Sequence, residues 1–392
     1  MAHERILVAM SGGVDSSMAA RLLIEQGYDC VGGTMRLFGD DASPATSTSA
    51  EARCGNARDI EDARAVAAQL GIPFTVFDCR EAFDRDVVEA FVQAYERGVT
   101  PNPCTLCNRR IKFGLLLECA RSMGCGTVAT GHYARVRTRL DSTGNPVYEL
   151  AKAADPAKDQ SYFLYGLTQD VLAHVRFPLG DLIKERDVRA AAQAAGLPVA
   201  HKHESQGICF VPKNDFATFI ENRRGTALPE GDIVSTDGTL LGHHHGAIRY
   251  TVGQRKGLGV AASKPLYVTA IDALANTVVL GDEEDLFAST LIAEDWVWSA
   301  PTTELARALA HATETQEGLP ASAQIRYHQP NQAVRLFLED GDASQTRAVR
   351  VCFDQPQRAI APGQAVVIYQ DDVVLGGGTI TRALKGTTEL RR

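Results

Sequence analysis

Three cysteines lie in sequence contexts that favour chemistry over packing. Cys104 and Cys107 are three positions apart in the segment 100–112, where prolines precede them and three basic residues follow. A helix N-terminus and nearby cations both stabilise a thiolate and so lower the pKa of a thiol. We therefore expect at least one of these two cysteines to be reactive. Cys209, in the Gly-containing segment 205–210, is a second candidate that meets the first site only if its loop folds back.

A phosphate-binding motif precedes these cysteines. Residues 6–17 read Ile-Leu-Val-Ala-Met-Ser-Gly-Gly-Val-Asp-Ser-Ser, an apolar strand that leads through a glycine- and hydroxyl-rich turn into a helix. Unpaired backbone N–H groups and the positive end of the helix dipole meet at such a turn, where phosphate can bind. The Walker lysine is absent, which disfavours transfer of a γ-phosphoryl group. Asp15 suits either a Mg²⁺ ion held against the phosphates or a cap on a helix that starts at Ser16.

The thiols have three alternative interpretations. Buried structural cysteines are the simplest, but a Pro-flanked loop beside arginines is a poor place for burial. A zinc or iron-sulfur site would take three ligands from Cys104, Cys107 and Cys209, and the sequence offers no obvious fourth. A sulfur-handling pair, in which one cysteine carries a persulfide and the other resolves it, fits best beside a nucleotide-binding loop.

Composition indicates an ordinary soluble globular protein with two or three domains, since the chain has 392 residues, 45% hydrophobic and 22% charged. The net charge of −8 argues against indiscriminate nucleic-acid binding, because neutralising phosphates requires clustered cations. Nine scattered cysteines indicate reduced thiols, most of them small buried hydrophobes such as Cys30. Without a long apolar run or a charged-then-apolar leader, we expect a cytoplasmic protein with no membrane segment. Each local basic cluster, taken singly, is most simply interpreted as a solvent-exposed face. The clusters are Arg109, Arg110 and Lys112; Arg135, Arg137 and Arg139; and Arg249, Arg255 and Lys256.

The alternation of strands and amphipathic helices up to about residue 210 predicts an α/β, Rossmann-like, doubly wound parallel sheet. Ligands of such sheets bind at the carboxyl ends of the strands, where both 11–17 and 131–132 fall. The expected strands are 6–9, 30–35, 74–77 and 127–130, and the expected helices are 16–26, 57–70, 83–95 and 108–123. Segment 38–52 is predicted to be a mobile insertion, 134–151 a hairpin around 141–145, and 160–196 helical.

After residue 211, short strands separated by turn residues predict two small β-rich, barrel-like domains. The economical division is a catalytic unit at 1–210, a central β-rich unit at 211–286 and a C-terminal β-barrel unit at 287–392. The expected strands are 239–241, 266–271 and 277–280, then 324–327, 333–338, 348–353 and 365–369. The run 243–245, three consecutive histidines, has neither alternating spacing nor a carboxylate partner and is predicted to be a loop; no metal site is assigned.

The string Ser-Gly-Gly-Val-Asp-Ser-Ser at 11–17 resembles the signature of the ATP pyrophosphatases, which split ATP between its α and β phosphates. Over essentially its whole length the chain resembles the tRNA-specific 2-thiouridylases. The motifs that carry the resemblance follow the family's order: the loop 11–17, Pro-Cys-x-x-Cys-Asn within 100–112, Gly-His-Tyr-Ala-Arg at 131–135, Lys-Asp-Gln-Ser-Tyr-Phe-Leu at 158–164, 206–210, Tyr-Thr-Val-Gly-Gln-Arg-Lys-Gly-Leu-Gly at 250–259 and Ala-Pro-Gly-Gln at 361–364.

The resemblance implies that the substrates are ATP with Mg²⁺ and the wobble uridine in the anticodon arm of a tRNA. Adenylation of the C2 oxygen makes AMP the leaving group; a persulfide on Cys209 then attacks C2, and Cys107 completes sulfur release by forming a disulfide with Cys209. A cysteine desulfurase or a sulfur-relay protein is the implied donor. An iron-sulfur-dependent thiolase, an adenylating ligase with the same loop and a nucleotide-sensing RNA-binding module are the alternatives.

The resemblance also assigns site residues, which are grouped here by role. Ten hold ATP: Ala9, Met10, Ser11, Gly12, Gly13, Val14, Asp15, Ser16, the Met35 backbone and Gly131. Three flank the target base: Asn102, Pro103 and Cys104. Seven contact tRNA: His132, Lys158, Asp159, Gln160, Arg326, Tyr327 and Gln364. The chain departs from many relatives at Cys104, where they have Asp, and at His328, which weakens one predicted phosphate contact.

Overall fold

The N-terminal part of the chain is a parallel sheet wrapped by helices. The computed structural model describes residues 4–39, 56–202, 207–339 and 348–385. The first sheet has five parallel strands in the order β3-β2-β1-β4-β7. Most of the predicted insertion 38–52 lies outside the described residues. The strands are β1 (Arg5–Ala9), β2 (Asp29–Arg36), β3 (Phe74–Asp78), β4 (Thr127–Thr130) and β7 (Val175–Arg176).

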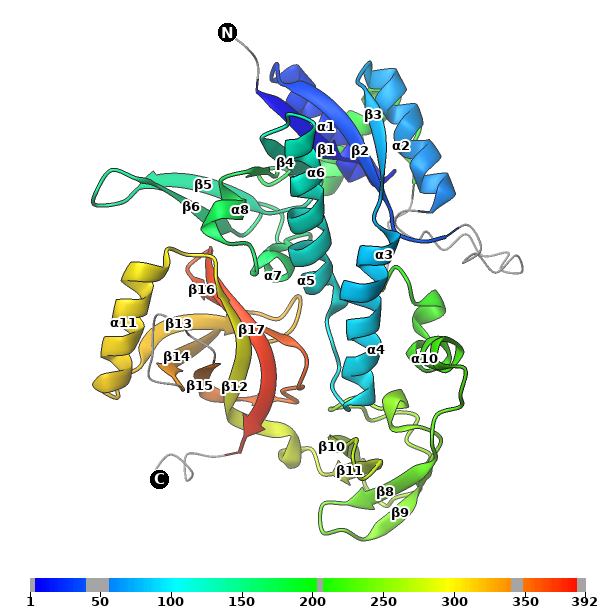
Figure 1. Cartoon of the computed structure of the whole chain (residues 1–392). Coiled ribbons are helices and arrows are strands. Elements are labelled where there is room, and N and C mark those ends of the chain that lie inside the picture. Colours follow the sequence, from blue (N-terminus) through cyan, green and yellow to red (C-terminus); the bar gives the residue numbers. More distant parts are fainter. Residues whose placement is uncertain (1–3, 40–55, 203–206, 340–347, 386–392) are drawn as a thin grey trace.

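Burial on both faces explains why β1 is a continuous apolar run. Ile6 and Val8 pack on one face, against α1 and α2, while Leu7 packs on the other, against α6. All three are fully buried, as expected for a central parallel strand covered on both sides. The prediction of a Rossmann-like doubly wound sheet is therefore confirmed (Figure 1).

Helices occupy most of the predicted positions, with earlier starts. The helix after β1 begins at Val14 rather than Ser16, and the helix predicted from 108 begins at Pro103. Residues 160–196 are not one helical region, because they contain several short helical pieces and β7. The bounds are α1 (Val14–Glu25), α2 (Ala57–Leu70), α3 (Arg80–Phe83), η2 (Asp84–Val88), α4 (Glu89–Glu96), α5 (Pro103–Cys107), η3 (Asn108–Leu115), α6 (Leu116–Ser122), α7 (Ser161–Leu164), α8 (Gln169–Leu172), η4 (Lys184–Arg189) and α9 (Ala190–Ala194).

The strand order creates a topological switch point between β1 and β4. The chain goes from β1 outward to β2 and β3 on one side, and returns to place β4 and β7 on the other. At such a point the loops that follow the two central strands diverge and leave a crevice outside their carboxyl ends. The loop 10–13 follows β1 and residues 131–134 follow β4, so both predicted nucleotide motifs border this crevice.

The C-terminal part is a closed barrel of six strands. Its order is β12-β15-β14-β13-β16-β17, and an additional β12–β17 pairing closes it. Sequence patterning located β14 to β16 but missed β12 and β17 and misplaced β13, predicted at 324–327. Figure 1 shows α11 on the outside of the barrel. The bounds are β12 (Phe287–Trp298), α11 (Thr302–Glu314), β13 (Leu319–Gln324), β14 (Gln332–Leu338), β15 (Ala348–Arg358), β16 (Ala365–Gln370) and β17 (Val373–Leu384).

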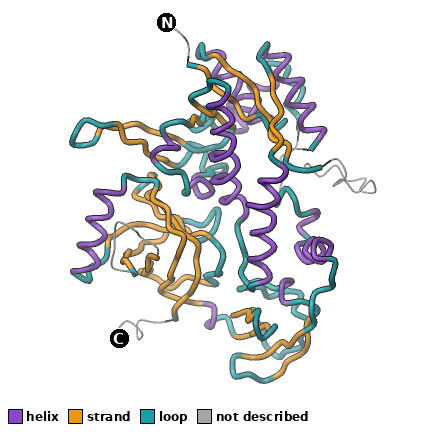
Figure 2. Tube along the Cα trace, viewed as in Figure 1, coloured by secondary structure: helices purple, strands orange, loops and turns teal. Residues whose placement is uncertain are grey.

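A small four-stranded sheet, in the order β10-β11-β8-β9, lies between these parts in the sequence. The predicted loop at 243–245 is wrong for its first two residues, because His243 and His244 end β9. Helices crowd around the first sheet, whereas the rest of the chain is mainly strand and loop (Figure 2). The bounds are η5 (Pro212–Asn214), α10 (Phe216–Arg224), β8 (Gly231–Ser235), β9 (Leu240–His244), η6 (Ala247–Arg249), β10 (Tyr267–Asp272), β11 (Thr277–Gly281) and η7 (Glu284–Leu286).

The barrel is fastened to the first unit at several points, among them a strand pairing and a contact with Thr100. The predicted hairpin is present as β5 (Arg135–Leu140) and β6 (Pro146–Ala151), and β6 pairs with β17 of the barrel. Farther along the chain, Gln364 donates from Nε2 to the carbonyl of Thr100 at 2.8 Å, and Thr100 donates its N–H to Pro362 at 3.0 Å. The barrel thus holds the stretch of chain that leads into α5.

Gly363 makes this second contact close. Its φ is +90°, and a Cβ there would lie 2.8 Å from the Thr100 carbonyl oxygen. We predict that Gly363→Ala lowers the free energy of unfolding by about 2 kcal/mol, from left-handed strain plus the clash. The matched control is Gly124→Ala, which has φ +74° but nothing within 4 Å of the added Cβ. Equal losses in chemical denaturation would contradict a tight contact at Thr100.

Candidate functional site

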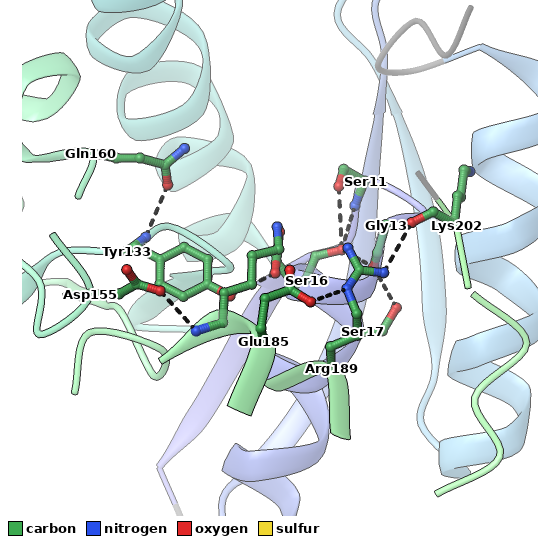
Figure 3. A network of polar contacts seen from close by, with 12 residues as sticks. Ser11, Gly13, Ser16, Ser17, Tyr133, Asp155, Gln160, Glu185, Arg189 and Lys202 are labelled. Atoms are coloured by element: carbon green, nitrogen blue, oxygen red, sulfur yellow. Dashed lines mark hydrogen bonds and ion pairs between the residues drawn. The ribbon is translucent and has the colours of Figure 1, made fainter. Parts of the chain in front are cut away.

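The loop after β1 is organised by its own serine hydroxyls. Ser11 donates its N–H to Ser16 Oγ at 3.1 Å, and the hydroxyl of Ser17 donates to the Gly13 carbonyl at 2.8 Å. Gly13 is the N-cap of α1, so the cap has no side chain that could occupy the first N–H groups of the helix. Figure 3 shows the hydroxyls gathered around this turn. The loop therefore keeps a preformed anion-binding end at the switch point.

Asp15 does not cap the helix, contrary to one of the two predictions for it. Its Oδ1 accepts from the Tyr133 hydroxyl at 2.8 Å and its Oδ2 accepts from Lys184 Nζ at 2.7 Å. The Lys184 side chain is only 3% exposed, and its backbone N–H donates to Asp155 at 2.9 Å. The carboxylate is thus compensated by a buried ammonium that comes from η4, distant in sequence.

Gly131 closes the other side of the crevice. A Cβ at this position would lie 2.6 Å from the backbone nitrogen of Ser16, so the chain after β4 rests directly on the start of α1. Only glycine permits this approach without displacing backbone. Ala9, at the end of β1, pairs with Gly33, and Met35 lies near the end of β2 opposite Phe77. The predicted ATP residues are therefore at one end of the sheet; their contact with ATP stays a prediction.

The two cysteines on α5 lie in different environments. Cys104 is exposed, whereas Cys107 is buried, so the expectation that this segment is a poor burial site is wrong for Cys107. Pro103 occupies the first helical position, where its missing N–H costs nothing, and α5 then runs on through η3. Asn108, also buried, donates to the Phe163 carbonyl at 3.0 Å and so anchors the helix just after Cys107.

Cys209 reaches the same region. It is half-buried and packs against an apolar cluster that contains Cys107, Phe91 and Phe210. The Phe210 ring contacts Phe91 with centroids 5.0 Å apart, which holds the segment on α4. The loop that carries Cys209 therefore folds back onto the apolar cluster that also contains Cys107; bonding reach between the two sulfurs stays a prediction. By contrast, burial raises the pKa of Cys30 to about 11, which confirms that thiol as a small hydrophobe.

His132 joins the cysteine helix to the nucleotide loop. Its Nδ1 is 2.7 Å from the Thr130 hydroxyl, and its Nε2 is 3.4 Å from Lys112 Nζ on η3. Lys112 follows Cys107 by five residues, about 7 Å along a helix axis. Because the neighbouring Gly131 touches α1, the nucleotide loop and the cysteine helix share the β4 end of the sheet.

The predicted tRNA contacts also carry structural bonds. Gln160 Oε1 accepts from the Tyr133 N–H at 2.9 Å, and the Asp159 carboxylate accepts from three donors at residues 153 and 161. Arg326 donates to the carbonyls of residues 358 and 359, while the Tyr327 ring contacts Phe163 in a tilted arrangement with centroids 4.4 Å apart. Residues 158–160 and Tyr327 thus lie near α7, and Gln364 is the barrel clamp on Thr100. Their contact with tRNA stays a prediction.

Within the described ranges, no three His, Cys, Asp or Glu side chains are grouped so that they could hold a metal ion. The cysteines 104, 107 and 209 therefore do not form such a group in this arrangement. The histidine run is also dispersed: His243 pairs with Asp232 at 2.8 Å and His245 with Glu230 at 2.8 Å.

None of the helices in the described part of the chain is both long enough and apolar enough to cross a membrane.

Sequence reasoning missed Lys184 as a site residue. Lys184 lies in η4, 169 residues after Asp15 in the sequence. A lysine in a stretch of charged residues is predicted to be exposed to solvent. The missing Walker lysine was the one usable signal, because a phosphate loop without its own cation needs compensation from elsewhere.

Comparison with known families gives three matches, which follow one another along the chain and together cover most of it. Residues 4–213 match the family described as "tRNA methyl transferase HUP domain". Residues 217–282 match "tRNA methyl transferase PRC-barrel domain", and residues 288–380 match "Aminomethyltransferase beta-barrel domain". The fold and these matches define the class: a HUP-type α/β domain followed by two β-barrel domains.

Relatives that match this chain over nearly their whole length identify the family more narrowly. The chain is 46% identical over 383 residues to a protein of Geobacter metallireducens named tRNA-specific 2-thiouridylase MnmA, covering 98% of both chains. It is 47% identical over 387 residues to the protein of that name from Geotalea uraniireducens, covering 98% of this chain and 97% of the relative. The chain belongs to the tRNA-specific 2-thiouridylase family.

Removing the buried ammonium tests the Asp15 arrangement. We predict that Lys184→Met lowers the free energy of unfolding by about 2 kcal/mol, because a partly buried carboxylate loses its counter-charge. The double variant Asp15→Asn/Lys184→Met should recover most of this loss, since the new asparagine side chain still accepts from Tyr133 and carries no charge. Thermal or urea unfolding measures both, and an unchanged single variant would contradict compensation by Lys184.

His132 gives a pH-dependent test. Burial, and secondarily the Lys112 ammonium, hold the pKa of His132 well below its usual value. The neutral ring therefore stabilises the fold above about pH 6.5, the unfolded pKa, and this stability is lost as the pH falls toward the lower folded pKa. His132→Gln should flatten the fall in unfolding free energy between about pH 6.5 and 5. Identical slopes in the wild type and His132→Gln would contradict the prediction.

Proposed function

We propose that this chain is a tRNA 2-thiouridylase that adenylates the C2 oxygen of the wobble uridine and then replaces that oxygen with sulfur. The observation that carries the proposal is a juxtaposition. One end of the parallel sheet bears an anion-binding loop without a Walker lysine, a helix with Cys107, and the Cys209 segment packed on the apolar cluster that contains Cys107. An adenylation site and two thiols are what this chemistry requires.

The adenylation step is needed because the C2 oxygen of uracil belongs to a urea-like carbonyl and is a poor leaving group. The oxygen attacks the α-phosphorus of ATP, an O–P bond forms, and pyrophosphate leaves with the bond electrons. The loop after β1 supports this step with oriented N–H groups at the α1 N-terminus, which stabilise negative charge on the phosphates. Compensation of Asp15 by Lys184 keeps that carboxylate from repelling them.

The sulfur step uses two thiols. The terminal sulfur of a Cys209 persulfide attacks C2, and AMP departs with the C2–O bond electrons. The Cys107 thiolate then attacks Cys209 Sγ, the S–S bond to the substrate sulfur breaks, and 2-thiouridine is released. The Cys107–Cys209 disulfide left behind is reduced by an external thiol before the next turnover. Packing of both residues in one cluster supports this pairing.

Mg²⁺ enters this scheme with ATP rather than on a protein carboxylate. Both Asp15 oxygens already accept hydrogen bonds, and the Lys184 ammonium lies 2.7 Å away, which disfavours direct coordination of a dication. We therefore assign Mg²⁺ to the phosphates of bound ATP and derive no catalytic step from it.

The three units divide the work in this proposal. Residues 1–210 adenylate and transfer sulfur, while 211–286 and 287–392 position the anticodon arm. Asn102, Pro103 and Cys104 flank the base, which must leave the anticodon stack to reach the α-phosphorus. Tyr327 offers a ring near residues 158–160, in keeping with RNA grip by stacking. The sulfur comes from a cysteine desulfurase or a relay protein, and the tRNA substrate places the enzyme in the cytoplasm.

The direct test incubates the purified protein with ATP, Mg²⁺, unmodified tRNA and a cysteine desulfurase with cysteine. Nucleoside analysis by mass spectrometry should show 2-thiouridine, formed together with AMP and pyrophosphate. Absence of 2-thiouridine from the wild type would refute the proposal. Pyrophosphate release without tRNA would favour an adenylating ligase, and activity that depends on iron would favour a cluster-dependent thiolase.

The cysteines give the sharper prediction. Cys107→Ala and Cys209→Ala should each lower 2-thiouridine formation by at least about 100-fold, because each removes a sulfur atom that takes part in the bond changes. Cys119→Ala, on α6 farther along the same helical run, is the matched control and should stay within about threefold of wild type. Full activity of Cys209→Ala with the persulfide donor would contradict the assignment. A Cys104→Ala loss as large as the Cys107→Ala loss would favour a three-cysteine cluster.

A further inference from the structure

A neutral partner holds the ammonium of Lys112. Its Nζ lies 3.4 Å from Nε2 of His132. Because an ammonium can only donate, Nε2 is the acceptor, and the proton of the neutral ring is then on Nδ1, which donates to the Thr130 hydroxyl at 2.7 Å. Burial lowers the pKa of His132, which keeps the ring neutral. The hydrogen bond therefore locates the ammonium without cancelling its charge.

Two phenylalanine rings fix the orientation of His132. Phe113, the neighbour of Lys112 on η3, has its ring centroid 5.7 Å from that of His132, and Phe177 has its centroid 6.0 Å away. Both phenylalanines are buried. Packed by these rings and bonded to Thr130, the imidazole has little freedom to turn, so Nε2 keeps the ammonium in one place.

Lys112 differs in its partner from two other lysines near the nucleotide loop. Lys184 Nζ lies 2.7 Å from Asp15, and Lys202 Nζ lies 2.7 Å from Asp59, so a carboxylate compensates each charge. Within the described ranges, Lys112 has no carboxylate in ion-pair contact. Its ammonium uses one of its three donors on His132 and has two left for an anion.

Along its helix, Lys112 lies between the sheet and the thiols. Leu116 and Leu117 pack on the sheet against Leu7, whereas Cys107 packs in the separate apolar cluster that also contains Cys209. Figure 1 shows α6 alongside the sheet and α5 beyond its end. Lys112 precedes Leu116 by four residues and follows Cys107 by five, which are about 6 Å and 7 Å along a helix axis.

The nucleotide loop borders the same place. Gly131 lies against the backbone nitrogen of Ser16 at the start of α1, and His132 follows it directly. In the proposed function the N–H groups at this end of α1 bind the phosphates of ATP. One oxygen joins the α-phosphorus to C2, so the reacting base lies between α1 and Cys107. Lys112 borders this space from the β4 side, because its Nζ lies against His132.

We propose that Lys112 is a catalytic residue whose ammonium binds the α-phosphate during adenylation and again when AMP leaves. The inference rests on the proposed function. In the first step the C2 oxygen bonds to the α-phosphorus, pyrophosphate leaves with the electrons of the broken P–O bond, and the N3 proton passes to water. In the second step the persulfide sulfur bonds to C2, and AMP leaves with the electrons of the C2–O bond. N3 regains a proton from water as 2-thiouridine is released. Both transition states carry extra negative charge at the α-phosphate, which a fixed ammonium stabilises.

The test measures the rate constant of pyrophosphate release in the first turnover, with saturating ATP, Mg²⁺ and unmodified tRNA. Lys112→Gln can still donate to His132 but carries no charge, and should lower this rate constant by at least about 100-fold. Lys112→Arg keeps the charge and should regain at least about tenfold of that loss. The matched control is Arg121→Gln, which removes an exposed cation from α6 of the same helical run and should stay within about threefold of wild type.

Binding and unfolding measurements separate this role from two others. Thermal unfolding midpoints of the Lys112 variants should stay within about 3 °C of wild type, because no ion pair is lost. If Lys112 instead binds a tRNA phosphate, Lys112→Gln would raise the Kd for tRNA and lower its salt dependence by about one phosphate contact. The rate constant at saturating tRNA would then stay within about threefold of wild type, which would overturn the proposal.

A loss in Lys112→Gln that is equally large in a folded Lys112→Arg would also overturn the proposal, since the charge would then not be what the reaction needs. If wild type releases no pyrophosphate with tRNA and forms no 2-thiouridine, the proposed function fails instead.

Discussion

The whole site depends on a backbone contact between the chain after β4 and the start of α1. Gly131 lies against Ser16 with no space for a Cβ, so the switch-point crevice has one fixed wall rather than two separate loops. His132, the next residue, approaches Lys112 on the helix that carries Cys107. The distance between the nucleotide loop and the Cys107 helix is therefore set by contacts at one end of the parallel sheet. That rigidity suits a reaction in which an adenylated base must be attacked at once.

Charge around the nucleotide loop is supplied from a distance. A loop that lacks a Walker lysine leaves Asp15 and Asp59 without local counter-ions, and the chain brings Lys184 and Lys202 to them from late in the first unit. Both lysines form ion pairs with carboxylates, so the loop would present mainly backbone N–H dipoles to the phosphates of a bound nucleotide. The absence of a lysine from the loop disfavours transfer of the terminal phosphoryl group, in keeping with the proposed attack at the α-phosphorus.

The fold of the first unit followed from the sequence because its signals are local. The strand 6–9 is apolar on both faces, and the helix 57–70 ends at Gly71 with φ +70°, so periodicity and end signals agree. The barrel was harder, because β12 and β17 run for twelve residues each with bulges, and the Gly-rich middle of β17 gives a weak alternating pattern. Strand β7 has only two residues and no pattern at all.

Prediction of the site residues likewise succeeded where the sequence signal is local and failed where it is not. Motifs located Cys107, Cys209 and the nucleotide loop, since each has a local sequence context. The partners of Asp15, Asp59 and Thr100 lie more than 100 residues away in sequence, and only the tertiary structure brings Lys184, Lys202 and Gln364 to them. Burial of Cys107 could likewise not be predicted, because Cys107 packs in a cluster of residues far apart in sequence, among them Leu37, Phe91 and Phe210.

The central claim is that sulfur passes from a Cys209 persulfide to C2 of the uridine, and that Cys107 releases it by forming a disulfide with Cys209. A single turnover with persulfidated protein, ATP, Mg²⁺ and excess tRNA, quenched by alkylation and analysed by peptide mass spectrometry, tests it most directly. The account predicts one Cys107–Cys209 disulfide for each 2-thiouridine formed. Formation of 2-thiouridine with both cysteines recovered as alkylated thiols would contradict it.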